Sequence, residues 1–178
     1  MKEETVQVAN NIKPTEKKEK KKKETEVPTQ GVVNPKGHIP VTTVMGNTTD
    51  EDLVFIWQDF SIPLNQKVEY IFKEIGEDNS AYEIPGNEMA YEYEDFIIYT
   101  YLDKKETERV KKIEILTENY STRKGVSYGD YASALKKHYG NPVYQKSNEK
   151  HFGSKAKRVI FTYQNNLITE LTYEFFPQ

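Results

Sequence analysis

Residues 62–76, with the sequence IPLNQKVEYIFKEIG, and residues 126–140, with the sequence VSYGDYASALKKHYG, decide the predicted fold. In the first stretch, apolar side chains recur at Val68, Ile71 and Ile75, which is the spacing of one helix face. The second stretch repeats most of that stripe, and both end on a glycine, where helices commonly stop. The two stretches therefore predict two similar amphipathic helices.

A strand-rich stretch follows each predicted helix, and residues 89–95 alternate with a period of two, which indicates a β-strand. These stretches, together with one that precedes the first helix, are residues 53–58, 89–95, 96–103, 109–116, 160–163 and 168–173. The expected fold class is α+β: two tandem helix-plus-three-strand repeats, with the helices packed on one face of an antiparallel sheet.

The composition changes along the chain. Residues 1–30 contain eight lysines and six glutamates but no aromatic residue, whereas the remainder holds 17 basic and 22 acidic residues and every aromatic. A lysine and glutamate mixture with scattered prolines and no aromatic residue cannot offset the entropy cost of ordering. We expect a disordered charged tether and loop over residues 1–50, a first repeat over residues 51–118 and a second over residues 119–178.

Whole classes of protein are excluded by the same composition. The chain has no cysteine, and therefore no disulfide framework or thiolate metal site. A formal net charge of -3 provides no general attraction for phosphate backbones, so we expect no nucleic-acid partner. No stretch of the sequence is long and apolar enough for a transmembrane helix. We expect no cofactor and a monomeric protein.

Residues 91–101, YEYEDFIIYTY, residues 125–130, GVSYGD, and residues 139–142, YGNP, carry a family resemblance. With the tandem pattern around them, they resemble the beta-lactamase-inhibitor-protein-like superfamily, and are similar to uncharacterised lipoproteins of Gram-positive gut bacteria, over roughly residues 52–178. The resemblance implies an extracytoplasmic module joined by a charged tether to a lipidated N-terminus, and it supplies no catalytic residue. Because the sequence has no signal peptide and no lipobox cysteine, membrane attachment requires an anchor absent from this chain.

Ser127 lies in a Gly-x-Ser-x-Gly motif, the pattern of a hydrolase nucleophile elbow. That elbow needs a parallel sheet, whereas we expect an antiparallel one, and the first repeat has Pro63 at the corresponding position. His38, His138 and His151 lack the spacing of zinc ligands. We therefore expect no catalytic residue and no metal site.

The tyrosines are the more promising feature, since they recur with period two on neighbouring predicted strands. Two interpretations remain open: the aromatic side chains form the core under the helices, or they form an exposed face for recognition. For the second interpretation, the candidate ligand-binding residues are Tyr91, Tyr93, Tyr99, Tyr101, Phe161 and Tyr163.

We accordingly expect a non-enzymatic binding module at the cell surface or in the secreted fraction, with a protein or a cell-wall component as its partner. The alternative is a secreted protein inhibitor of a hydrolase that uses the same sheet face. A hydrolase acting through Ser127 is a third interpretation.

Overall fold

The structure is a computed structural model that describes residues 47–178; the predictions made for residues 1–46, including most of the tether and His38, lie outside the described residues. In chain order, the elements are a 3₁₀ turn (Asp50–Leu53), β1 (Val54–Trp57), β2 (Phe60–Pro63), α1 (Val68–Ile75), β3 (Ser80–Ile84), β4 (Glu88–Glu92), β5 (Phe96–Leu102), β6 (Glu108–Ile115), a second 3₁₀ turn (Ala132–Ala134), α2 (Leu135–Tyr139), β7 (Tyr144–Gln145), β8 (Glu149–Gly153), β9 (Lys157–Gln164) and β10 (Leu167–Phe175).

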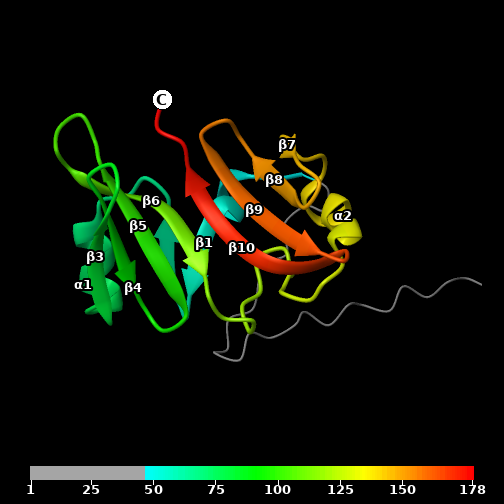
Figure 1. Ribbon diagram of the computed structural model, residues 1–178, viewed down its shortest axis with the longest axis horizontal. Coiled ribbons are helices and arrows are strands. Elements are labelled where there is room, and N and C mark those ends of the chain that lie inside the picture. The colour runs from blue at the N-terminus through cyan, green and yellow to red at the C-terminus, as the bar shows by residue number, and fades with distance from the viewer. Residues whose placement is uncertain (1–46) are drawn as a thin grey trace, which may run out of the picture. The chain divides into compact units, whose positions relative to one another are not determined.

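Eight of these strands form one antiparallel sheet in the order β3-β4-β5-β6-β10-β9-β8-β7, and β1 and β2 form a separate hairpin. Each half of the large sheet is a run of chain neighbours, β3 to β6 on one side and β7 to β10 on the other (Figure 1). Strands that follow one another through short turns pair readily in this way. The halves join where β6 and β10 pair, through the partners Glu114 and Thr172, Ile113 and Tyr173, and Lys112 and Glu174.

Beyond this junction, the segment before α1 takes over the edge of β6. The backbone N–H of Asn65 donates to the carbonyl of Val110 at 2.8 Å, and the N–H of Val110 donates to the carbonyl of Gln66 at 2.9 Å. Backbone groups left unpaired in a protein interior are costly, and these two bonds satisfy Val110 where β10 has diverged.

The expected fold class is wrong. The described residues are mostly antiparallel β-sheet with two short helices, and each half of the sheet contains four strands rather than three. The stripe over residues 62–76 is helical only over Val68–Ile75, because its first residues belong to β2. In the second stretch, only Leu135–Tyr139 is α-helical. Helices of eight and five residues are too short to form the covering layer that an α+β repeat requires.

Both helices end at a glycine, as predicted. Gly76 and Gly140 each have a φ of 83°, a conformation that residues with a side chain rarely adopt. The N–H of Gly76 donates to Phe72, and that of Gly140 donates to Lys136, so each glycine also closes the last turn.

Phe55 of β1 provides much of the layer under the sheet. Its ring lies 5.0 Å from Phe96 of β5 and 6.1 Å from Tyr173 of β10, so one side chain contacts both halves. Figure 1 shows β1 behind the sheet between β6 and β10. All three side chains are at most 1% exposed. Burial of each large aromatic side chain contributes about 1.5–3 kcal/mol to the free energy of unfolding. The β1–β2 hairpin, through Phe55, therefore provides the covering layer that the sequence assigned to helices.

Candidate binding face of the sheet

The strand register divides the side chains of the sheet between two faces, since residues directly opposite each other on neighbouring strands point the same way. The face that packs on Phe55, here the inner face, includes one row of register partners: Tyr91, Ile98, Ile113, Tyr173, Val159 and Phe152. From Ile98 to Phe152 these side chains are fully buried.

The opposite face, here the outer face, consists of the alternate residues. One row of partners is Tyr82, Ala90, Tyr99, Lys112, Glu174, Arg158 and Gly153, and the next is Glu92, Ile97, Glu114, Thr172, Ile160, His151 and Tyr144. Most of these side chains keep part of their surface in solvent, in contrast to the inner row. Tyr82 and Tyr144, near the two edges of the sheet, are 43% and 42% exposed.

The six aromatic residues predicted to share one face do not do so. Tyr91 packs edge-on against Phe72 of α1 at 4.6 Å, and Tyr93 stacks on Phe96 at 4.8 Å. Both lie on the covered side, and burial raises the pKa of Tyr93 to about 12. For these two residues the core interpretation holds, and the prediction of a shared face was wrong.

Phe161 and Tyr163 also lie on the inner face. Phe161 is fully buried and contacts Tyr139 at 5.1 Å, while Tyr163 pairs with the buried Ile168. Tyr101 is at the end of β5, where its hydroxyl donates to the side-chain oxygen of Asn65 at 2.6 Å. These three side chains therefore pack against other parts of the protein.

Tyr99 lies on the outer face, because its partner on β4 is Ala90 rather than Tyr91. Its hydroxyl donates to Glu114 at 3.1 Å, and the ammonium group of Lys112 lies 3.7 Å from its ring centroid. Lys112 also donates to the same Glu114 oxygen at 3.1 Å. Burial, with the nearby Glu114 carboxylate, raises the pKa of Tyr99 to about 12, so its hydroxyl remains a donor at neutral pH.

A second polar cluster on the outer face surrounds His151, which is only 6% exposed. Its Nε2 pairs with the carboxylate of Glu149. Its Nδ1 lies 3.3 Å from Nη1 of Arg158, which can only donate. The ring therefore bridges an acid and a base, and all three side chains are held in defined positions.

Glu174 lies between these two clusters, next to Lys112 on one side and Arg158 on the other in the same row. Burial raises the pKa of the Glu174 carboxyl above its usual value, while Lys112 is the foremost of the cations that oppose this rise. The centre of the outer face thus alternates between positive and negative groups, an arrangement suited to specific polar recognition.

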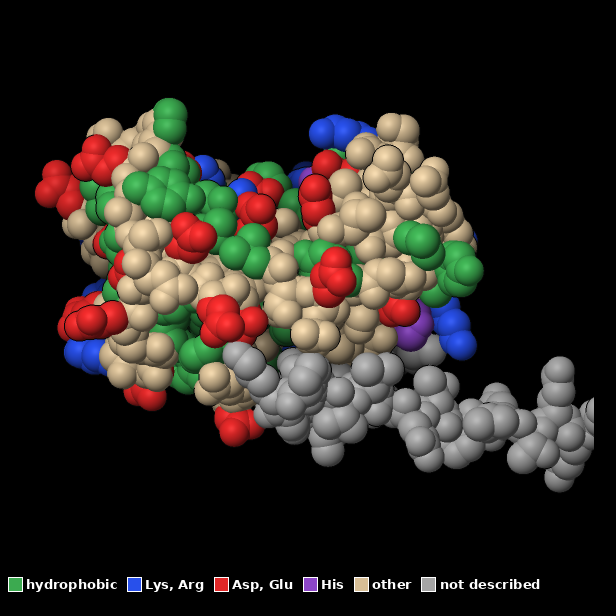
Figure 2. All heavy atoms as spheres, turned by 60° about the horizontal axis from the view of Figure 1, so that its bottom comes forward, with side chains coloured by type: hydrophobic (Ala, Val, Ile, Leu, Met, Phe, Trp, Pro, Cys, Tyr) green, Lys and Arg blue, Asp and Glu red, His purple; other side chains and the backbone are tan. Residues whose placement is uncertain are grey.

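Other exposed apolar groups come from separate elements. Tyr70 of α1, Tyr131 before the second 3₁₀ turn and Val143 before β7 are all more than half exposed. In the view of Figure 2, hydrophobic patches are separated by dispersed acidic side chains. The outer face is distinguished from this background by its paired charges.

Sequence reasoning missed the charged members of the outer face. Lys112 and Glu114 are two residues apart on β6, as are Glu149 and His151 on β8, so the period of two already placed each pair on one face. The sequence therefore shows which residues of one strand share a face. It does not show which residue of the neighbouring strand lies opposite, because that depends on the register.

Ser127 does not occupy a nucleophile elbow. It lies in a turn, and its backbone N–H donates to the Asp130 carboxylate at 2.8 Å. The two later histidines bond elsewhere: His138 lies 3.0 Å from the carbonyl of Lys124, and His151 belongs to the outer face. The antiparallel sheet also differs from the parallel sheet that such an elbow requires.

Within residues 47–178, no three acidic or histidine side chains group in a way that would hold a metal ion. No helix in this part of the chain has the length and apolar character needed to cross a membrane. The chain matches no family model, no curated protein and no solved structure. The resemblance to the beta-lactamase-inhibitor-protein-like superfamily stays a prediction.

Proposed function

We propose that this chain is a non-enzymatic binding module that presents the outer face of its sheet to a protein partner. The observation that carries the proposal is the Tyr99, Lys112 and Glu114 cluster, in which an aromatic ring, a cation and a carboxylate are held together but remain partly exposed. Tyrosine is enriched among the residues that dominate protein interfaces.

Preorganisation supports the same proposal. The side chains of Tyr99 and His151 are fixed by hydrogen bonds before any partner arrives, so less side-chain entropy is lost on association. Alternating charges around Glu174 favour a protein with a complementary pattern over a uniformly charged polymer.

Capture of partners from a cell-envelope extract tests the proposal. The full chain is immobilised, and the double variant Tyr99→Ala/Lys112→Ala is compared with it. We expect the variant to capture the partner at least tenfold less efficiently, because truncation of a hot-spot residue costs about 2 kcal/mol or more and tyrosine is enriched among such residues. An assay of the captured protein for hydrolase activity then separates simple binding from inhibition.

The matched control is another tyrosine and lysine pair, Tyr70 and Lys73 on α1, in which the ammonium lies 6.0 Å from the ring. Tyr70→Ala/Lys73→Ala removes the same chemistry outside the sheet and should leave capture unchanged. Equal capture by both double variants, or selective loss in the control, contradicts the proposal.

The compartment is a separate part of the proposal. We propose an extracytoplasmic location, with the lysine- and glutamate-rich residues 1–30 serving as a solvated spacer. Fractionation of the source cells, followed by protease treatment of intact cells, tests this directly. Protection of the native protein until the cells are lysed would contradict it.

A further inference from the structure

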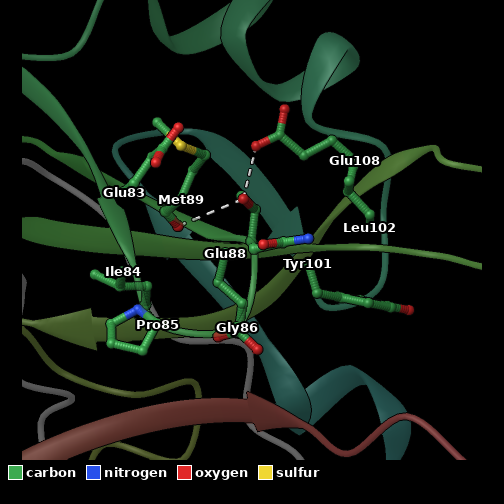
Figure 3. Close-up of a pocket in the computed structure, with 11 residues that line it drawn as sticks. Glu83, Ile84, Pro85, Gly86, Glu88, Met89, Tyr101, Leu102 and Glu108 are labelled. Carbon is green, nitrogen blue, oxygen red and sulfur yellow. Dashed lines mark hydrogen bonds between the residues drawn. The ribbon is translucent and has the colours of Figure 1, made fainter.

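A pocket of about 450 Å³ lies at the turn between β3 and β4, away from the Tyr99 cluster. It is lined by the hairpin residues 83–89, by residues 100–102 at the end of β5, and by Glu108 at the start of β6. Figure 3 shows Ile84 and Pro85 on one side of this space, with Leu102 and Glu108 on the other.

The carboxylate of Glu108 is held by neutral donors. The Thr100 hydroxyl donates to its Oε1 at 2.6 Å, and the Tyr91 hydroxyl donates to the same oxygen at 2.9 Å. The contact with Thr100 is drawn in Figure 3. Thr100 is only 1% exposed, so the pocket-facing carboxylate rests on a buried, fixed support. Both donors are uncharged, so they hold the carboxylate in place without supplying an opposite charge.

Among the described residues, no basic side chain forms an ion pair with Glu108. The other half-buried carboxylate of the pocket, Glu88, is already paired with Lys111. Glu83, the third carboxylate of the lining, is exposed. Glu108 is therefore the half-buried negative charge of the pocket whose cationic partner is not supplied by residues 47–178.

Apolar side chains complete the lining. Ile84 and Pro85 lie beside the turn, Met89 follows on β4, and Leu102 is 51% exposed at the end of β5. An aliphatic chain that ends in a cation matches such a pocket, because its methylene groups contact the apolar walls while its charge meets the carboxylate.

We propose that this pocket binds a primary ammonium group carried on an aliphatic chain, either the side chain of a lysine in a peptide or a free alkylamine. The Glu108 carboxylate receives the ammonium, and Ile84, Met89 and Leu102 contact the methylene groups. The lining does not include Tyr99, Lys112 or Glu114, and the site does not depend on the function proposed for the outer face.

Titration of the full chain, followed by the amide resonances of residues 83–89 and 100–102, tests the proposal. The probes are Nα-acetyl-lysine N-methylamide, n-butylamine and the uncharged Nα-acetyl-norleucine N-methylamide. We expect millimolar binding of the lysine probe and at least tenfold weaker binding of the norleucine probe. Binding of n-butylamine within threefold of the lysine probe identifies a free amine as sufficient, whereas tenfold weaker binding identifies a peptide side chain as the source.

Glu108→Gln should weaken binding of the lysine probe at least tenfold, and Glu118→Gln, at an exposed loop position, should not change it.

Should Glu108→Gln fail to fold, Leu102→Ala provides the second test. Leu102 is a half-exposed residue of the pocket wall, so its truncation is tolerated, and the variant should bind the lysine probe about threefold more weakly. Equal binding of the lysine and norleucine probes, or unchanged affinity in the folded variants, overturns the proposal. Tyr99→Ala/Lys112→Ala should retain amine binding, which separates this test from that of the outer face.

Discussion

Nη1 of Arg158 lies 3.3 Å from Nδ1 of His151, and this contact fixes the tautomer of the buried histidine. A guanidinium has no acceptor, so Nδ1 accepts and the ring proton resides on Nε2, where it donates to Glu149. In the His151 ring of the outer face, Nε2 is therefore the hydrogen-bond donor and Nδ1 is the acceptor.

Nitrogen-15 NMR at neutral pH should show His151 as the Nε2–H tautomer. His138 is the internal control, because its Nδ1 lies 3.0 Å from the Lys124 carbonyl, which can only accept. The neutral His138 ring should consequently be the Nδ1–H tautomer. The same tautomer at both positions would contradict these contacts.

Asp103 should make the stability of the protein depend on pH in the acid range. The hydrogen bond from Arg109 Nε at 2.6 Å, followed by those from the backbone N–H groups of Thr107 and Lys105, lowers the pKa of Asp103 to about 2. Because the pKa of Asp103 is lower in the folded than in the unfolded protein, its ionised carboxylate stabilises the folded state at pH values above the unfolded pKa. This contribution disappears as the pH falls from about 4 to 2. Urea unfolding across this window should show a shallower pH dependence for Asp103→Asn than for the parent, and equal slopes would exclude the effect.

Gly153→Ala should be strongly destabilising. Gly153 has a φ of 127°, and a Cβ there would lie 2.5 Å from the carbonyl oxygen of Lys157 and 3.0 Å from the side chain of Leu53. Backbone strain and overpacking each cost about 1–3 kcal/mol of stability.

Gly129→Ala is the matched control, since the φ of Gly129 is 76° but its surroundings are open. We expect this variant to lose only about 1 kcal/mol of stability. Thermal unfolding should rank the parent first, Gly129→Ala second and Gly153→Ala last; the reverse order of the two variants would refute the steric argument.

Lys124→Met should destabilise the protein by about 3–5 kcal/mol, because it leaves the buried Asp52 carboxylate without the ammonium that lies 3.4 Å away. The side chains of both residues are at most 2% exposed. The double variant Asp52→Leu/Lys124→Met should recover part of the loss, since it removes the uncompensated charge. Lys73→Met, which breaks the exposed pair with Glu69, should barely move the denaturant midpoint. A similar shift in both single lysine variants would argue against burial as the cause.

Local periodicity in the sequence predicted the central strands well. The stretches 96–103 and 109–116 correspond closely to β5 and β6, and the stripe beginning at Val68 corresponds to α1. The strand β3 was missed because four of its five side chains are exposed, which leaves no alternation of burial to detect. Helix length was overestimated because Ile62 and Leu64 extend the apolar pattern while belonging to the β2 region.

The candidate site depends on information that local patterns do not contain. Tyr91 and Tyr99 are both tyrosines at alternating positions, but the turn between β4 and β5 sets Tyr99 opposite Ala90 and thereby places the two tyrosines on opposite faces. Across the sheet, the pairing of Tyr99 with Lys112 depends on an irregularity after Tyr99, where β6 has one extra residue. Neither the turn geometry nor this bulge follows from the alternation itself.

The short pairing of β6 with β10 has a kinetic consequence. Every other neighbour in the large sheet follows its partner directly along the chain, so each half requires only the closure of short loops. The β6–β10 pairing instead brings together strands separated by the whole of the second half up to β10. Contacts of such long sequence separation slow folding, and we infer that joining of the halves, with Phe55 packing beneath them, is the slow step in forming this sheet.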